Sequence, residues 1–598
     1  MVLIAFFKRR LTKALTTVFL LSPLNFFLAE SVTGMKIVYD KVYQLNGQET
    51  MIKRILRNGS NFLSRRQTSI LSAASVVMVM IAISRLLGLV RNRVLAHFFS
   101  AEDLAVYFAA FRLPEVIFEI LVFGSLSSAF IPTFTTYLSR KKKKEAWQVA
   151  ALSLNLALLI FAFFAFLIFL FARPLYQILA PGFTPAQLDQ TAKLARLLLL
   201  AQGFFVFSYF LTGVLESLQR FLVPALAPLF YNLSIILGTL FWAESRGIFA
   251  PTLGAVGGAL IHFLIQLPLA LSLGFRPKLS LNFSHPGVKE IKTLALPRII
   301  ELSALQVNKS AELFLASLVS SAAYTHFTFA NSLQLLPVGL FGASLAKASL
   351  PALSRLSAKG NQQRFGQTLI ACFNEIIFLV IPCSVFLAVL RIPLVRLVFG
   401  AARFTWESTV QTGQTLSAFC LSIFAQALVY LLTRAFWSTH ETKTPVVVSI
   451  FSIFLNIVLG GFFILVLHWS IWSLALAFSL ASIVQALILF WLLIRKFDVL
   501  MPAKIILPFC KVVLASFFSG GLMYFCLKIL DRLVFDTHYA INVIFLTALV
   551  GSVGLVSYLF LTYVFGLKEL TVFTKFLAKL KHPGALKAKI SVEEDLNP

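Results

Sequence analysis

Charged residues are scarce in this 598-residue chain, where Asp, Glu, Lys and Arg together make up 13%. Soluble domains carry about 25% of such residues. Apolar residues account for 59% of the chain, and Phe alone contributes 62 positions. This balance excludes an ordinary soluble domain and predicts an all-α polytopic membrane protein, because helices satisfy their own backbone hydrogen bonds in lipid.

Residues with reactive side chains are also few, and they lack the spacing of a catalytic or metal site. The five cysteines all lie in apolar stretches without a CxxC pair, so they are interpreted as small buried apolar residues. The eight histidines are scattered, and no phosphate-binding glycine loop, nucleophile elbow or zinc motif occurs. We therefore expect neither an enzyme nor a bound cofactor or metal.

Acidic residues number 24 against 52 Lys and Arg, which gives a formal net charge of +28. In a soluble protein such an excess would suggest nucleic acid. In a membrane protein it is typical of cytoplasmic loops, where basic residues accumulate beside anionic headgroups. No nucleic-acid partner is expected.

Apolar runs long enough to cross a bilayer, about 20 residues each, recur throughout the chain. They predict fourteen helices, near 70–99, 103–138, 144–172, 192–218, 221–243, 252–275, 290–319, 322–356, 366–391, 411–437, 443–467, 470–495, 505–530 and 540–566. Basic residues gather in the connections near 140–144, 276–292, 355–364 and 495–504, which follow even-numbered helices. This pattern predicts that both termini are cytoplasmic.

Residues 1–66 form a basic N-terminal extension that does not fit a cleaved leader. An apolar stretch at 14–29 resembles a signal peptide, but a translocated segment would carry the basic residues that precede 67. We interpret it as a cytoplasmic or interfacial segment, or as an upstream misreading of the start, since Met51 offers another one. The tail at 568–598 is expected to be cytoplasmic.

An arginine stands inside the first apolar run, where it is costly. Arg85 is followed by Arg91 and Arg93, and a guanidinium stays charged at any accessible pH. Placing this charge at bilayer depth costs at least about 3 kcal/mol. Arg85 and Arg91 therefore predict a polar interior and an anionic cargo. Six positions place them about 120° apart on an ideal helix, and Gly88 between them would permit a bend.

The second and eighth predicted helices resemble each other. Each has a Leu-Pro pair, then Phe-Gly near Gly124 or Gly342, and then a proline at Pro132 or Pro351. The similarity is either chance between two apolar helices or the trace of two six-helix lobes. Gly124, Pro132, Gly342 and Pro351 are interpreted as helix-packing or hinge residues.

Several blocks match a known family in order. SRLLGLVRNRVLAHFF and YFAAFRLPEVIFEILVFGSLSSAFIPTF resemble the first two helices of the MurJ (MviN) lipid II flippases. QRFLVPALAPLFYNLSIILG, GAVGGALIHFLIQLPLAL, FANSLQLLPVGLFGASLAKASLPALSR and RAFWSTHETKTPVVV resemble later blocks. The resemblance covers roughly residues 70–500.

The resemblance implies the MOP exporter fold. It assigns residues 67–280 to an N-lobe, 281–498 to a C-lobe that closes a V with it, and 499–567 to two helices forming a lipid-tail groove. The implied cargo is lipid II or a related undecaprenyl-pyrophosphate-linked glycan. Alternating access would carry it to the outer leaflet of the bacterial cytoplasmic membrane for peptidoglycan synthesis and cell shape, driven by a cation gradient or the membrane potential.

The resemblance also implies site residues. Arg85 and Arg91 match cavity arginines of the family, and Arg112 matches a position that either contacts cargo or pairs with Glu115 or Glu119. The family's further charges are replaced by Ala105, Phe118, Phe123 and Ser332.

Lys309 is a candidate substitute cation, unless it is neutralised by Glu312 three residues on. Glu312 and Asn456 form a candidate cation site. Two alternatives stay open: export of another lipid-linked oligosaccharide or a drug, and a non-transporting scaffold.

Overall fold

The computed structural model describes residues 70–123, 129–276, 285–497, 503–537 and 539–570. Within these ranges every regular element is a helix, which confirms the predicted all-helical class. The N-terminal extension at 1–66, Gly124 and most of the C-terminal tail lie outside the described residues. The helices group into two compact units.

The first unit contains the chain up to Ser332 together with Val395–Thr415 and Ile453–Ala477. Its helices are α4 (Ile70–Phe98), α5 (Ala101–Phe118), η1 (Glu119–Phe123), α6 (Ile131–Ser139), α7 (Lys143–Leu179), α8 (Pro185–Ser217), α9 (Leu222–Arg246), α10 (Phe249–Ser272), α11 (Pro286–Val319) and the first part of α12 (Ala323–Pro337). The η elements are π-helical turns. Parts of α15 (Arg391–Phe399), α16 (Trp406–Cys420), α18 (Lys443–Gly461) and α19 (Trp472–Lys496), with η4 (Phe462–Val466), complete it.

Local capping sets where two of these helices begin. Ser100 accepts a hydrogen bond from the backbone N–H of Asp103, whose carboxylate accepts one in return from the backbone N–H of Ser100. Thr184 and Gln187 form the same reciprocal pair at the start of α8. Because each box satisfies otherwise unpaired N–H groups, the chain can turn within two residues between α4 and α5.

Small residues allow α9 and α10 to cross in close contact. A Cβ atom on Gly238 would lie 2.9 Å from the Cα atom of Gly254, and one on Gly254 would lie 2.9 Å from the Cα atom of Ile235. Close backbone approach is the usual basis of helix association in membranes, since lipid supplies no hydrophobic driving force. Helix α4 packs against α9, and helix α8 packs against α10.

The apolar core of this unit joins α6, α7, α8 and α10 and contacts α11. Phe130 stacks on Phe134, and Phe210 contacts Phe130 with ring centroids 4.7 Å apart. All three rings are fully or almost fully buried. Burying aromatic rings of this size stabilises the packing of these helices.

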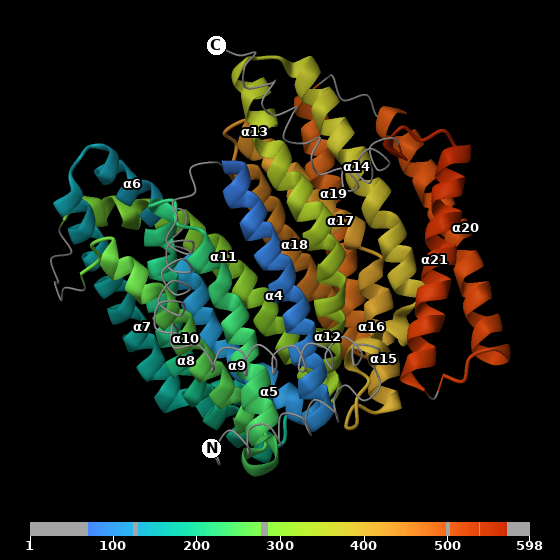
Figure 1. Cartoon of the computed structure of the whole chain (residues 1–598), viewed down its shortest axis with the longest axis horizontal. Coiled ribbons are helices and arrows are strands. Elements are labelled where there is room, and N and C mark those ends of the chain that lie inside the picture. The colour runs from blue at the N-terminus through green and yellow to red at the C-terminus, as the bar shows by residue number, and fades with distance from the viewer. Residues whose placement is uncertain (1–69, 124–128, 277–284, 498–502, 538, 571–598) are drawn as a thin grey trace, which may run out of the picture. The chain divides into compact units, whose positions relative to one another are not determined.

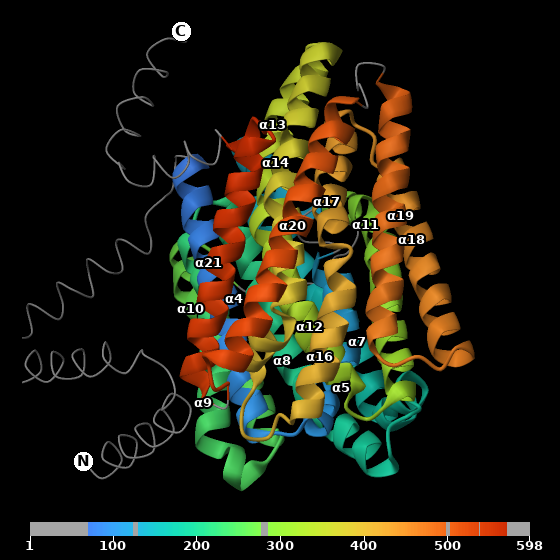
Figure 2. The same ribbon diagram turned by 90° about the vertical axis from the view of Figure 1, so that its right-hand side faces the viewer.

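The second unit contains Leu333–Leu394, Leu416–Ser452 and the chain from Phe478 onward. Its elements are the end of α12, η3 (Val338–Ala343), α13 (Ser344–Ala358), α14 (Gln362–Val389), α17 (Ile423–Ser438), α20 (Ala503–Leu533) and α21 (Ala540–Val564), with parts of α15, α16, α18 and α19. Helices α20 and α21, coloured red, lie side by side in Figure 2, and α20 packs against α14. Met523, Leu546 and Val550 form their shared core with Leu390.

Ten described helices are long and apolar enough to span a membrane, or eleven if the bent pair α16 and α17 counts as one span. The chain is therefore a multi-pass membrane protein. The other three predicted spans coincide with α4, with α5 to α6, and with α11. The total of fourteen stays a prediction.

Four expected helices are interrupted within the described residues. The span predicted at 411–437 breaks at Leu421 and Ser422, where the Ser422 hydroxyl donates to the carbonyl of Phe419 and contacts Ser479. A serine that bonds to a backbone carbonyl competes with the helical ladder. The spans predicted at 103–138, 322–356 and 443–467 contain the π-helical turns η1, η3 and η4.

Candidate functional site

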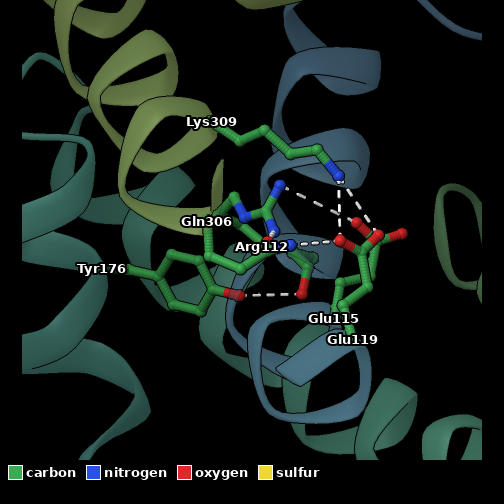
Figure 3. Close-up of polar contacts among 7 residues, drawn as sticks. Arg112, Glu115, Glu119, Tyr176, Gln306 and Lys309 are labelled. Atoms are coloured by element: carbon green, nitrogen blue, oxygen red, sulfur yellow. Dashed lines mark hydrogen bonds and ion pairs between the residues drawn. The ribbon is translucent and has the colours of Figure 1, made fainter. Parts of the chain in front are cut away.

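A buried polar cluster joins α5 and η1 to α11 within the first unit. Arg112 on α5 is only 3% exposed, and its guanidinium donates to the side-chain carbonyl of Gln306 on α11. The Glu115 carboxylate lies one turn further along α5, 4.0 Å from Arg112 Nη1. Figure 3 shows these side chains converging from the two helices. Arg112 therefore has protein partners, including Glu115 as the sequence allowed.

Glu119, the first residue of η1, accepts hydrogen bonds from two residues of α11. Lys309 Nζ lies 3.1 and 3.0 Å from its two carboxylate oxygens, and the Gln306 amide also donates to it. Dashed lines in Figure 3 mark these bonds. Lys309 forms its ion pair with Glu119 and not with Glu312, the alternative partner, since η1 brings the Glu119 carboxylate within reach of α11. The positive charge of Lys309 is therefore balanced by the Glu119 carboxylate within the protein itself.

A tyrosine fixes the backbone beside Arg112. The Tyr176 hydroxyl on α7 donates to the carbonyl of Ala110 at 2.8 Å, and the whole side chain is buried. Pro114 lies within α5 and has no N–H to donate, so the carbonyl of Ala110 lacks its usual helical donor. Tyr176 supplies that missing donor and holds α5 against α7.

Arg91 is held by neutral amides. Its guanidinium donates to the side-chain oxygen of Asn92 at 3.0 and 3.2 Å and to that of Asn232 on α9 at 3.1 Å. Among the described residues no carboxylate forms an ion pair with it. Amides orient the guanidinium without neutralising it. Arg91 thus keeps a positive charge that an anionic group can meet.

Arg85 is exposed and lies on another face of α4 from Arg91, as their spacing predicted. The helix runs continuously through Gly88 between them. A Cβ atom at Gly88 would meet only the Asn232 oxygen, at 4.0 Å, which is an ordinary contact. Asn232 also donates to the backbone and hydroxyl oxygens of Ser84, at 3.4 Å each. Helix α9 thereby orients this polar stretch of α4.

Glu312 belongs to a second group, formed by α11 and α18. The Asn308 amide donates to Glu312 at 2.8 Å, and the Asn456 amide donates to the Asn308 oxygen at 2.8 Å. The Asn456 side-chain oxygen is buried and has no hydrogen-bond partner. Carboxylate and amide oxygens are the ligands that hard cations prefer. Glu312, Asn308 and Asn456 thus bring carboxylate and amide oxygens together, and the cation site stays a prediction.

Apolar packing fills two of the positions where the family resemblance led us to expect charges. Ala105 is fully buried, and Phe118 packs its ring against Phe205 and Tyr209, with centroids 5.9 and 5.3 Å away. Ser332 bonds to the carbonyl of Phe329 in its own helix. The side chain of Phe123 lies outside the described residues.

Of the predicted packing and hinge residues, Gly342 has the tightest surroundings. A Cβ atom there would lie 2.6 Å from the Cβ atom of Ala427 on α17, so Gly342 is a helix-packing residue. Pro132 and Pro351 are exposed, and their role as hinges stays a prediction. The π-helical turn η1 begins five residues after Pro114, whereas η3 begins directly after Pro337. The two-lobe origin of the internal similarity stays a prediction.

Sequence reasoning missed Gln306, Asn308, Asn232 and Tyr176 as members of these clusters. Polar side chains inside apolar helices were their only signal, and this signal does not name a partner. The sequence signal of Glu119 was stronger, since a carboxylate within a spanning helix requires a hydrogen-bond donor or a cation as its partner.

The whole chain was compared with known proteins. A family model described as "Lipid II flippase MurJ" matches residues 94–545. This chain belongs to the MurJ family. The "Probable lipid II flippase MurJ" of Vibrio cholerae is 30% identical over 409 residues, covering 66% of this chain and 77% of that protein. The Bdellovibrio bacteriovorus protein of the same name is 27% identical, covering 82% and 93%.

Solved structures agree on the fold of this MurJ-family chain. The inward closed conformation of lipid II flippase MurJ superposes with a TM-score of 0.70 at 23% identity, covering 82% of this chain and 98% of that one. An inward-facing multidrug resistance MATE transporter of the MOP superfamily superposes with a TM-score of 0.61 at 14% identity, covering 71% and 98%. The MOP fold implied by the sequence is confirmed.

Proposed function

We propose that this MurJ-family protein flips lipid II, or a closely related undecaprenyl-pyrophosphate-linked glycan, across the cytoplasmic membrane for peptidoglycan synthesis. The family match across residues 94–545 carries this proposal. The relatives in Vibrio cholerae and Bdellovibrio bacteriovorus bear the name of that activity, and this chain covers most of their length.

Arg91 supports an anionic cargo. Its charge is met only by amides, in a helix where an uncompensated guanidinium is costly. A pyrophosphate offers several oxygens that suit the planar donor fork of arginine. Arg85, six residues earlier on α4, would extend the cationic surface. Arg112 would bind the phosphate only by giving up its contacts with Gln306 or Glu115. Lys309 would likewise have to give up its ion pair with Glu119.

Cation coupling is the second part of the proposal. Glu312, Asn308 and Asn456 would hold a monovalent or divalent cation through oxygen atoms, and the unpartnered Asn456 oxygen supports this role. The cation would supply charge balance for Glu312. Binding and release of that cation would then bias one conformation of the transporter over another.

We place both termini in the cytoplasm on the basis of the basic connections, and we assign no catalytic step to the chain. The exporters of drugs, which share the fold at 14% identity, supply no observation that favours a drug as cargo. No contact among the described residues favours the alternative of a non-transporting membrane scaffold either.

Replacement of the native flippase in a depletion strain tests the function. The full chain should restore growth, whereas Arg85→Ala and Arg91→Ala should each abolish rescue at equal expression. Arg246→Ala is the matched control, because Arg246 is an exposed arginine at the end of α9 and should not matter. A well-inserted native chain that fails to rescue would overturn the lipid II assignment. Full rescue by Arg85→Ala and Arg91→Ala would remove only the cavity-cation role.

A further inference from the structure

An apolar groove lies on the outer surface of the first unit, between α7 and α8. It has a volume of about 740 Å³, within the range of roughly 300–1,000 Å³ that is usual for ligand pockets. Phenylalanines dominate its walls, with Phe161 and Phe166 on α7 and Phe204 and Phe207 on α8. Gly203, also on α8, contributes no side chain and so leaves room at its centre.

Two basic residues, Lys193 and Arg196, stand among the lining residues. They lie one turn apart on α8. Arg196 donates from Nε to the carbonyl of Phe169 at 2.9 Å, and its guanidinium carbon lies 5.5 Å from the centre of that ring. No acceptor in the described part of the chain bonds to its terminal nitrogens. Among the described residues, neither Lys193 nor Arg196 forms an ion pair.

The neighbouring arginine behaves differently. Arg173 on α7 pairs with Asp189 on α8, with 2.5 Å between Nε and a carboxylate oxygen. The charge of Arg173 is thus balanced by the protein. The charges of Lys193 and Arg196, which line the groove, are not.

Helix length places these cations at a membrane surface. The stretch of α8 from Leu197 to Leu215 carries no charged residue and would span about 28 Å at 1.5 Å per residue. The hydrocarbon core of a bilayer is about 30 Å thick. Arg196 therefore lies at headgroup level, and the apolar groove beside Leu200 and Phe204 extends from that level toward the membrane interior. On the proposed topology this is the outer leaflet.

We propose that this groove is a binding site for an anionic phospholipid. One acyl chain lies along the phenylalanines and over Gly203, and the phosphodiester meets Lys193 and Arg196. The bound lipid is anionic, because two cations without an ion-pair partner at headgroup depth attract a negatively charged group. The apolar walls select a lipid over a free anion. The site lies on the surface of α7 and α8 and is separate from the residues assigned to cargo.

Photolabelling of the purified full chain in nanodiscs tests the proposal. Phosphatidylglycerol with a diazirine on its acyl chain is added as a minor component to phosphatidylcholine, and labelled peptides are identified by mass spectrometry. Labelling of α7 and α8 is compared with labelling of α19, whose Leu487 and Trp491 are also exposed. We expect severalfold enrichment in the groove for the anionic probe, and none for a phosphatidylcholine probe.

Matched variants separate the charge from the groove. Lys193→Gln and Arg196→Gln should each lower groove labelling about fivefold, while Arg173→Gln, which removes the same charge outside the groove, should not. Gly203→Phe keeps both cations but must place a ring in the groove, because its Cβ atom would already lie 3.5 Å from Phe161. It should also reduce labelling at an unchanged melting temperature.

Equal labelling by the two probes would overturn the proposal, and so would labelling that persists in the Lys193→Gln/Arg196→Gln double variant. Labelling does not depend on transport. A failed growth rescue would therefore leave this site standing, and a failed labelling experiment would leave the flippase assignment untouched.

Discussion

The exchange Glu119→Gln would leave the Lys309 ammonium without its carboxylate partner. In the native protein both carboxylate oxygens accept from Lys309, at 3.0 and 3.1 Å, and Gln306 donates as well. The variant retains the shape of the side chain but not its charge. A destabilised protein is expected, because a positive charge in a largely apolar helix bundle would lose its compensation.

The partial exposure of the pair sets the magnitude. The side chain of Glu119 is 25% exposed and that of Lys309 is 43% exposed. Breaking a fully buried pair costs about 3–5 kcal/mol, whereas an exposed pair contributes about 0.2–1 kcal/mol. We expect a loss of about 2 kcal/mol in unfolding free energy for Glu119→Gln and slightly less for Lys309→Met. The double variant leaves neither charge without a partner, so its loss should be smaller than the sum of the two single losses. The difference, which is the coupling energy of the pair, should be about 1.5 kcal/mol.

Reversible unfolding in mixed micelles measures these four free energies. The pair Lys142–Glu145 supplies the control cycle, since its atoms are also 3.1 Å apart but its side chains are 54% and 42% exposed. That cycle should show coupling of less than about 0.5 kcal/mol. Growth rescue gives a second readout: the Glu119→Gln/Lys309→Met double variant should still rescue, since its lost charges balance each other.

Coupling of Glu119 and Lys309 no larger than in the control cycle would refute the reasoning, because it would mean that the two groups do not interact in the membrane-embedded protein. Rescue lost in Lys309→Met and not restored in the double variant would instead show that Lys309 acts on the cargo directly.

Three further outcomes are expected. Gly254→Val should strongly lower the melting temperature, since even a Cβ atom there lies 2.9 Å from Ile235, whereas Gly257→Ala should be tolerated because its nearest contact is 3.5 Å. Glu441 lies in the connection before α18, and hydrogen bonds from Lys496 and, to a lesser extent, Thr444 lower the pKa of its carboxyl group. The Glu441→Gln variant should therefore have a lower melting temperature than the native chain at neutral pH. This difference should disappear as the pH falls through the lowered pKa. Sodium or calcium should raise the melting temperature of the native chain but not of Asn456→Ala, with Asn542→Ala as a control that still responds.

Local pattern in the sequence was enough to establish a multi-pass helical protein and the family. Apolar runs and basic connections depend on neighbouring residues, and a helix buried in lipid must satisfy its backbone locally. The ordered motifs around Arg85, Arg112 and Gly342 were sufficient for the resemblance that the comparisons then confirmed. The break near Ser422 was missed, because it depends on a contact made by a single side chain, and the π-helical turns η1, η3 and η4 were missed as well.

Partner choice was decided by the tertiary structure. Lys309 had Glu312 three residues away in sequence, yet it pairs with Glu119, 190 positions distant. Arg91 and Arg112 looked alike as membrane-embedded arginines, but one is held by neutral amides and the other lies beside a carboxylate. The physical reason is that hydrophobic periodicity is a property of one helix, whereas charge compensation depends on which helices pack together and in what register.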